Sequence, residues 1–598
     1  MTLIGIDLGT TYSSVAYVDA RGAVVTIPNA EGDLTTPSVV LYESNNEVVV
    51  GREAKLAAAA VPDKVAECVK RYMGEDRYPR QLGGRHRSPV EISAEILRKL
   101  KRDAEAKLKT ITGCVITVPA YFDESRRHAT TEAGRLAGLN VIDIINEPTA
   151  AALAYAYNHF VDREGQPRLL EDRDAIHSAL TQARTVMVYD LGGGTFDVTL
   201  LQIQGRHFRV LATEGDVRLG GKDWDEAMAK VLAQQFMSQH PSDPLEDPRS
   251  QPMLLRTAEE VKRNLSARSQ SHYVINHAGQ TYAGSITREE FDRATNPLLY
   301  RTERRVTRVL RQAGLEWSQV DEVLTVGGST RMPQVRTMLK AITGKEPNTS
   351  LSPDEAVSAG AAIQAVAQVA LIEQKQQAKP SGKQPAPSSP AQAPAGSPGK
   401  PASKPTSKPA GRPAPQAPPQ PPLDDDEVLD SDALEPLPDA PEPPDDALPG
   451  GAASIDVDAI LGRIDPKRAE LLRSIRITDV NSHSFGVIVT TADRLKAVSH
   501  LIPRNSPLPA QVTRVYGTVA HGQRSVSVRV VEGESPQPED CLPIGLCRVD
   551  LPAGLPPRTP IEVRFALDAG GQLHVQARWK GRNQWSSVTI DRSKPPSA

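Results

Sequence analysis

Two related stretches of the chain decide its fold: Leu3-Ile-Gly-Ile-Asp-Leu-Gly-Thr-Thr-Tyr12 and Val186-Met-Val-Tyr-Asp-Leu-Gly-Gly-Gly-Thr195. In each, a short apolar run that predicts a buried β-strand ends in an aspartate, and a turn of glycine and threonine follows. Small residues let backbone N–H groups approach a phosphate, and hydroxyls donate to its oxygens. The carboxylates of Asp7 and Asp190 can hold Mg²⁺, directly or through its water shell. The repeat therefore predicts two related lobes that grip one nucleotide.

Residues 1–371 continue this α/β pattern. Cys114–Val118 and Val323–Val326 predict further buried strands, and helical periodicity marks segments between them such as Ile92–Leu108. The last strand runs into Val326-Gly-Gly-Ser-Thr-Arg-Met-Pro, whose glycines would admit the face of an adenosine while Arg331 covers the base. This loop is neither a Walker A loop nor a dinucleotide-binding GxGxxG turn.

Composition excludes several classes of protein. The 598 residues carry 70 Lys and Arg against 73 Asp and Glu, so the chain is not basic throughout, as a simple nucleic-acid-binding protein would be. The four cysteines form no CxxC pair, which argues against a disulfide framework and a zinc site. No run reaches the ~18 apolar residues of a membrane helix, and the N-terminus has no basic signal region. We expect a cytoplasmic protein that binds neither membranes nor nucleic acid.

The composition changes beyond the α/β region. We predict a disordered linker over residues 372–450, because Pro380–Pro449 contains 21 prolines, with a basic half followed by an acidic half. Residues 451–475 predict a short amphipathic helical segment that docks on a neighbouring domain. From residue 476 to 598 the apolar residues alternate, as in Ser525–Val531, and turns separate the runs. This pattern predicts an antiparallel β-sandwich.

The chain resembles the 70-kilodalton heat-shock chaperone family (DnaK type). The matching segments occur in family order and include Val115-Ile-Thr-Val-Pro-Ala-Tyr-Phe, Ile145-Asn-Glu-Pro-Thr-Ala-Ala-Ala, Tyr189-Asp-Leu-Gly-Gly-Gly-Thr-Phe-Asp, Leu219-Gly-Gly-Lys-Asp-Trp-Asp and Ser352-Pro-Asp-Glu-Ala-Val. Asp479-Val-Asn-Ser-His-Ser-Phe-Gly extends the resemblance, more weakly, into the sandwich. The resemblance implies an actin-like ATPase domain with duplicated ribonuclease-H-like lobes, joined to a peptide-binding sandwich.

Site residues follow from the resemblance, position by position. ATP or ADP with Mg²⁺ are the implied ligands, and K⁺ is a further candidate. The implied catalytic residues, of which Asp7 and Asp190 also hold the metal, are Asp7, Lys70, Glu147, Asp190, Thr195 and Asp197. The implied nucleotide-binding residues are Gly9, Thr10, Thr11, Tyr12, Gly192, Gly193, Gly194, Thr195, Glu259, Lys262, Arg263, Ser266, Gly327, Gly328, Ser329, Arg331 and Asp354. Pro119 and Arg127 match positions that relay the nucleotide state.

The sandwich carries the candidate peptide site. The resemblance implies a cleft that holds a short extended apolar peptide by backbone hydrogen bonds and one central pocket. Val487, Val489, Val519 and Val526 are the candidates for lining it. The alternative for these valines is that they belong to the ordinary core of the sandwich.

The chain departs from the family pattern in four places. The long linker puts coupling between the domains in doubt, although Glu470–Val480 is a candidate substitute for the usual linker. The sequence stops soon after the sandwich, so we expect no helical lid and fast peptide exchange. Asp143 stands where the family usually has a basic residue, which predicts weak or altered stimulation by a J-domain co-chaperone. Residues 158–184 form a charged insertion, and the stretch between Tyr72 and Val90 is shortened.

Two functions remain open at this point. The first is an ATP-hydrolysing chaperone for unfolded or extended polypeptides, with a nucleotide exchange factor as a further candidate partner. The second is a nucleotide-gated, peptide-binding adaptor with weak or uncoupled ATPase activity. The complete set of catalytic residues favours the first, and the long linker and the short C-terminus favour the second. A filament-forming actin relative or a sugar kinase is disfavoured by the C-terminal sandwich.

Overall fold

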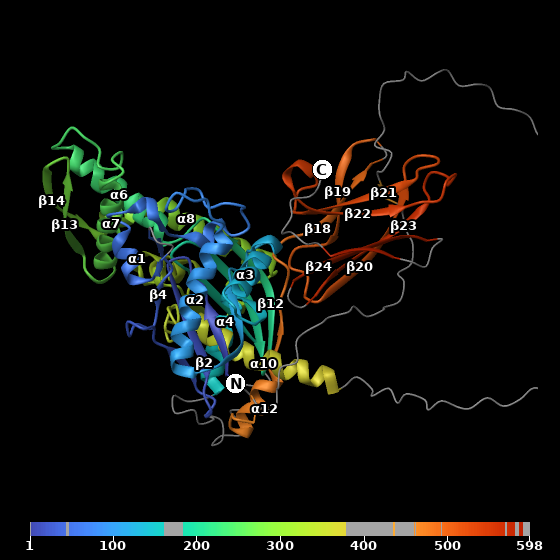
Figure 1. The fold of residues 1–598 in the computed structure, drawn as a ribbon, viewed down its shortest axis with the longest axis horizontal. Coiled ribbons are helices and arrows are strands. Elements are labelled where there is room, and N and C mark those ends of the chain that lie inside the picture. Colours follow the sequence, from blue (N-terminus) through green and yellow to red (C-terminus); the bar gives the residue numbers. More distant parts are fainter. Residues whose placement is uncertain are drawn as a thin grey trace, which may run out of the picture.

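The computed structural model describes residues 2–43, 47–160, 183–377, 434–436, 460, 462–491, 493–568, 571–580 and 585–589. Within these residues a two-lobed α/β region lies beside an all-β sandwich (Figure 1). The fold class predicted from the sequence is therefore confirmed. Of the helices in the described part of the chain, none is both long enough and apolar enough to span a membrane.

The first lobe is built on a mixed sheet with strand order β3-β2-β1-β8-β9, to which β4 adds by pairing with β2. Strand β1 is antiparallel to β2 and parallel to β8, and β8 is parallel to β9. The strands are β1 Thr2–Asp7, β2 Tyr12–Val18, β3 Val24–Ile27, β4 Thr36–Pro37, β8 Ile111–Val118 and β9 Val141–Asn146. The helices of this lobe are α2 Pro89–Leu108, α3 Glu124–Leu136 and α4 Glu147–Phe160.

The second lobe repeats this topology. Strand β10 is antiparallel to β11 and parallel to β15, as β1 is to β2 and β8, so Asp7 and Asp190 end equivalent strands. The strands are β10 Arg184–Leu191, β11 Phe196–Gln204, β12 His207–Asp216 and β15 Glu322–Val326. Around them lie α6 Gly221–Met237, α7 Ser250–Ala267, α8 Arg288–Gln312, α9 Pro333–Thr343, and the hairpin β13 Gln270–His277 and β14 Gln280–Thr287.

Two smaller parts complete the α/β region. The first lobe carries an outer sheet of β5 Val40–Tyr42, β6 Val48–Val50 and β7 Val65–Ala66, with α1 Arg52–Ala57 beside it. Helix α10, Ala356–Gln377, packs against α4 and against the strands β1 and β2, because its small residues allow close approach. A Cβ on Gly360, for example, would lie 1.8 Å from the carbonyl oxygen of Ala150 on α4.

The sandwich consists of two antiparallel sheets, which enclose one apolar core. One sheet has the order β19-β18-β21-β22 and the other the order β16-β20-β23-β24-β25. The strands of the first sheet are β18 Phe485–Thr490, β19 Lys496–Ile502, β21 Ser525–Glu532 and β22 Leu542–Asp550. Those of the second are β16 Leu434–Pro436, β20 Ala510–Thr518, β23 Pro560–Leu567, β24 Leu573–Trp579 and β25 Ser586–Thr589.

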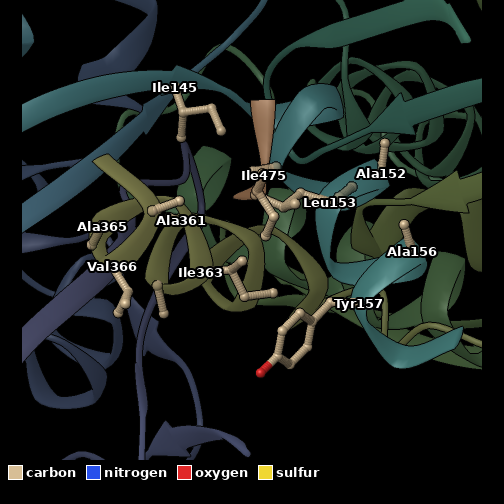
Figure 2. Packing of buried hydrophobic residues seen from close by; sticks show 14 of the residues in the cluster. Ile145, Ala152, Leu153, Ala156, Tyr157, Ala361, Ile363, Ala365, Val366 and Ile475 are labelled. Carbon is tan, nitrogen blue, oxygen red and sulfur yellow. The ribbon is translucent and has the colours of Figure 1, made fainter. Parts of the chain in front are cut away.

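The segment before the sandwich docks on the α/β region, as the sequence predicted for its amphipathic helix. Helix α12, Pro466–Ser474, packs against α10, and Ile460, Ile464 and Leu472 are buried in the core that α4 and α10 share. Ile475 follows and lies next to Leu153 of α4 (Figure 2). Strand β17, Arg476–Thr478, then adds in parallel to the edge strand β12 of the second lobe.

The structure differs from the predicted boundaries at two ends of the linker. Helix α10 runs to Gln377, six residues into the stretch assigned to the linker, because the helical pattern outlasts the apolar one. Leu434–Pro436, also assigned to the linker, forms β16 of the sandwich. The remaining linker residues lie outside the described residues. The same holds for most of the insertion at 158–184, of which α4 takes up the first residues.

Candidate nucleotide site

The two strand-ending aspartates lie close enough to each other to shift each other's pKa. Thr117 of β8 donates to Asp7 at 3.1 Å between Oγ1 and Oδ1. Burial raises the pKa of Asp7 to about 7, the charge of Glu147 adds to the rise, and Lys70 opposes it. Burial raises the pKa of Asp190 well above its usual range, and the negative charges of Glu147, Asp197 and Asp7 add to the rise. The mutual influence of these carboxylates shows that the end of β1 and the end of β10 meet in one site.

Lys70 and Glu147 form a buried ion pair in the same site. Lys70 lies on a short 3₁₀ helix, Val69–Tyr72, and Glu147 begins α4. Asp197, near the start of β11, accepts the backbone N–H of Tyr121 at 3.1 Å. Burial, followed by the charge of Glu147, raises the pKa of Asp197 to about 8. The six residues implied to be catalytic come from both lobes, and all but Asp7 are buried outright.

The two glycine and threonine turns touch each other across the lobes. A Cβ on Gly193 would lie 1.8 Å from Thr11 Oγ1, and a Cβ on Gly194 would lie 2.2 Å from Thr10 Cγ2. Only glycine fits these two positions, so the backbone of this turn lies directly against the threonine side chains. Among the residues that the structure describes, Thr10 Oγ1 is buried without a hydrogen-bond partner. A phosphate oxygen in this cradle would provide that partner.

Charged side chains bridge the lobes beside the phosphate turns. Lys55 of α1 contacts Glu259 of α7 at 3.1 Å and donates to the hydroxyl of Tyr12 at the same distance. Arg263 contacts Glu259 at 2.7 Å and donates to the Tyr12 hydroxyl at 3.0 Å. Lys262, on the same helix, lies 2.7 Å from a carboxylate oxygen of Asp225. This network joins the first lobe to the helix that carries the implied adenosine-binding residues.

The other residues implied to bind adenosine lie beside the turn that follows β10. Ser329 donates to the carbonyl oxygen of Gly192 at 2.9 Å, and Arg331 pairs with Asp354 at 2.7 Å. Gly327 has φ +84°, and a Cβ there would lie 2.4 Å from the carbonyl oxygen of Leu191, so glycine is required. Ser266 donates to the carbonyl oxygen of Lys262 one turn earlier on α7.

The sequence analysis missed three residues of this site: Lys55, Arg71 and Asp225. Arg71, next to Lys70, donates to the carbonyl oxygen of Gly194 at 2.9 Å and pairs with Asp223. No local pattern marks these charged residues. Lys55 and Arg71 enter the site through contacts between the lobes, and Asp225 enters it through its pair with Lys262 on the neighbouring helix.

The donor set fits Mg²⁺ and a nucleotide. Mg²⁺ keeps several of its waters and needs only one or two carboxylates, which Asp7 and Asp190 would supply. A cation beside them would also relieve the repulsion that raises their pKa values. No three His, Cys, Asp or Glu side chains in the described ranges are grouped to ligate one ion directly. Water-mediated binding by these two aspartates agrees with that arrangement.

The sandwich contacts the α/β lobes next to this site. Asn146, the residue before Glu147, donates to Asp479 at 2.8 Å and accepts from Arg127. The rings of Tyr121 and His483 lie 4.5 Å apart, and Ser482 donates to the carbonyl oxygen of Phe122 at 3.2 Å. The backbone N–H of Tyr121 is also the donor to Asp197, and Asn146 directly precedes Glu147.

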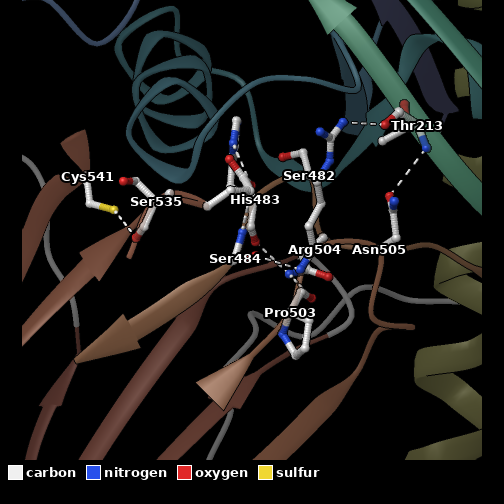
Figure 3. Close-up of polar contacts among 12 residues, drawn as sticks. Thr213, Ser482, His483, Ser484, Pro503, Arg504, Asn505, Ser535 and Cys541 are labelled. Atoms are coloured by element: carbon white, nitrogen blue, oxygen red, sulfur yellow. Dashed lines mark hydrogen bonds and ion pairs between the residues drawn. The ribbon is translucent and has the colours of Figure 1, made fainter. Parts of the chain in front are cut away.

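A second set of contacts joins the sandwich to the second lobe (Figure 3). Arg504 reaches Glu214 at 3.1 Å and donates to the carbonyl oxygen of Thr213 at 2.6 Å. Asn505 accepts the backbone N–H of Thr213 at 3.4 Å. The carboxylate of Glu214 is fully buried, and Arg305 also pairs with it at 3.3 Å. Both lobes therefore hold the sandwich directly, in addition to β17.

Three of the four candidate peptide-site valines lie in the core of the sandwich, which was the alternative to a peptide-binding role. Val487, Val489 and Val526 are buried in the sandwich core, because alternate residues of β18 and β21 point inward. Val519, just beyond the end of β20, keeps an exposed surface. Asp143 accepts from Gln364 and Gln368 of α10 at 3.0 and 2.9 Å. Its effect on a J-domain partner stays a prediction.

Comparison with known proteins decides the family. The model of the family described as Hsp70 protein matches residues 3–81, 77–376 and 443–598. The chain belongs to the Hsp70 family. It is 34% identical over 600 residues to the chaperone protein DnaK of two strains of Halobacterium salinarum, covering 98% of this chain and 75% of each relative. It is 33% identical to the chaperone protein DnaK of Thermus thermophilus over 624 residues, covering 99% of this chain and 80% of the relative.

Membership gives the fold and the class of activity. Hsp70 proteins are actin-like ATPases that bind ATP or ADP with Mg²⁺, and chaperones that bind unfolded polypeptides. The gap between the two C-terminal family matches, 377–442, falls in the proline-rich linker. The β16 strand lies within this gap, so the family pattern does not account for it.

Proposed function

We propose that this Hsp70 protein hydrolyses Mg-ATP between its lobes and uses the nucleotide state to control how the sandwich holds extended apolar polypeptide. The observation that carries the proposal is the intact catalytic set, in which Lys70 and Glu147 form a buried pair beside three carboxylates. Burying five ionisable groups together is costly unless a function requires it. The same arrangement argues against an adaptor without turnover.

The residues of the site divide the work of phosphoryl transfer. When bound, Mg²⁺ supplies charge neutralisation on the phosphate oxygens. The N–H groups of Gly193 and Gly194 and the hydroxyl of Thr10 would bind those oxygens. Lys70 would orient the attacking water and the terminal phosphoryl group, while Glu147 fixes the position of Lys70. The carboxylate of Asp197 would accept a proton from the attacking water, since burial raises its pKa to about 8 and makes it a stronger base than a solvated carboxylate.

The contacts beside the site support coupling to the sandwich. Asn146, which directly precedes Glu147, donates to Asp479 of the sandwich segment. Tyr121 contacts the ring of His483 and donates its backbone N–H to Asp197. A change in the position of Glu147 or Asp197 on hydrolysis would act on these contacts first. The long linker does not prevent coupling in this arrangement, because α12 and β17 bring the sandwich back to the lobes.

The proposal is tested by steady-state hydrolysis of Mg-ATP and by binding of a fluorescent ATP analogue. Lys70→Ala should lower the hydrolysis rate about 10²-fold or more, as the loss of one preorganised charge does, while the analogue still binds. Lys107→Ala, which removes an exposed lysine of α2, is the matched control and should change neither. Equal hydrolysis by the wild-type protein and Lys70→Ala would contradict the proposal and favour the adaptor.

A further inference from the structure

A short piece of the linker is built into the sandwich as an edge strand. β16, Leu434–Pro436, pairs with β20 in antiparallel fashion, so that Leu434 lies opposite Thr518 and Pro436 lies opposite Tyr516. It comes from the acidic half of the linker, 42 residues before β17 begins at Arg476. Without β16, this end of β20 would be a free sheet edge, which is a ready site for an added strand.

The side chain of Leu434 fills an apolar site between the two sheets. It is 0% exposed and belongs to the same buried cluster as Val487, Val489, Val526 and Tyr516. β16 packs against β18 and β21 of the opposite sheet as well as pairing with β20. Val487, Val489 and Val526 are three of the four valines that were candidates for lining the peptide cleft. They are buried with Leu434 in place.

This arrangement has both features of a bound peptide. The backbone of Leu434–Pro436 extends a sheet by strand addition, and one branched aliphatic side chain occupies a pocket. The buried leucine side chain and the backbone pairing with β20 both favour the bound segment. The covalent tether holds the segment at an effective concentration of about 1 mM, so the site is occupied when the Kd of the same segment as a separate peptide is about 0.1 mM or lower.

We propose that Leu434–Pro436 is a built-in ligand of the peptide site, held in the cleft between β18, β20 and β21. The proposal rests on the proposed function of the sandwich as a peptide-binding domain. A client segment must displace Leu434 before it binds, so the protein selects extended segments with a branched aliphatic residue that compete against a tethered leucine. Clients that bind more weakly than the tethered leucine are therefore excluded from the cleft.

The test uses the full-length protein and a fluorescein-labelled peptide with the sequence of residues 431–437, followed by fluorescence anisotropy. Leu434→Asp removes the internal leucine and should lower the Kd of the labelled peptide about tenfold or more, because competition at ~1 mM effective concentration is lost. Leu448→Asp makes the same change elsewhere in the linker and should bind the peptide as the wild-type protein does. Equal affinity in the wild-type protein and Leu434→Asp would overturn the proposal.

A second measurement separates this proposal from the function of the sandwich. Hydrogen exchange should show slow amides at Glu435 and Gly517, which lie opposite each other in β16 and β20, in the wild-type protein. Unlabelled peptide in excess should accelerate exchange at Glu435 while Gly517 stays protected. Fast exchange at Glu435 in the wild-type protein overturns the built-in ligand. Slow exchange there, together with no binding of the labelled peptide to Leu434→Asp, supports the internal strand but contradicts the proposed peptide-binding function.

Discussion

The hydrogen bond between Asn146 and Asp479 offers the sharpest test of how the sandwich is held against the lobes. Asp479 follows β17, and its carboxylate accepts the amide of Asn146 at 2.8 Å. Burial raises the pKa of Asp479, and the nearby charge of Arg127 offsets part of that rise. Asp479→Ala should therefore leave the Asn146 amide without its acceptor at the junction of the domains.

The expected magnitude follows from these contacts. A hydrogen bond to a charged acceptor contributes about 1.5–3 kcal/mol, and the desolvation of Asp479 brings the net loss to the lower end of that range. A loss of about 1.5 kcal/mol raises the undocked fraction roughly tenfold. Amide exchange in β17, where Arg476 donates to the carbonyl oxygen of Arg206, should accelerate by the same factor.

The assay is hydrogen exchange by mass spectrometry on peptides that cover β17. Asp479→Asn keeps an oxygen for Asn146 and should restore most of the protection. Asp493→Ala removes an exposed aspartate from the turn after β18 and should leave exchange in β17 unchanged. Unchanged exchange in Asp479→Ala would refute the role of this contact in docking.

Three further predictions follow from other contacts. Gly193→Ala should abolish binding of a fluorescent ATP analogue, because the new Cβ would lie 1.8 Å from Thr11 Oγ1; full binding would show that the two turns can separate. The bond to Glu534 and the charges of Glu532 and Glu534 raise the pKa of His483 against the opposing effects of burial and Arg504. The melting temperature should accordingly fall as pH rises above about 6.5, through the pKa of folded His483. This pH dependence should be smaller in His483→Gln. Identical pH profiles for the two proteins would contradict a stabilising role of protonated His483. Asp143→Arg should increase the acceleration of ATP hydrolysis by a J-domain protein, and no gain over the wild-type protein would remove Asp143 as the cause of weak stimulation.

The turns, strands and helices whose conformation depends on neighbouring residues could be predicted from the sequence. The turns after Asp7 and Asp190 were predictable because only small residues let a backbone pack so closely, and Gly193 and Gly194 show that contact directly. The alternation in β21 likewise predicted a strand with one face in the core. The amphipathic segment around Leu472 predicted a docking helix, which the structure places on α10.

Other features depend on contacts between distant segments, which no local pattern encodes. Lys55 enters the site because α1 of one lobe meets α7 of the other. Leu434 lies in a stretch whose proline and acid content predicts disorder, and its burial depends on a free edge of β20 that appears only after the sandwich has formed.

The central claim is that the nucleotide site controls the sandwich across the docked interface. The measurement that tests it most directly is the rate at which a labelled leucine-containing peptide leaves the full-length protein, chased with unlabelled peptide, in ATP and in ADP. We predict faster release in ATP than in ADP, and loss of this difference in Asp479→Ala. Equal release rates in ATP and ADP from a wild-type protein that binds the peptide and hydrolyses ATP would contradict the account.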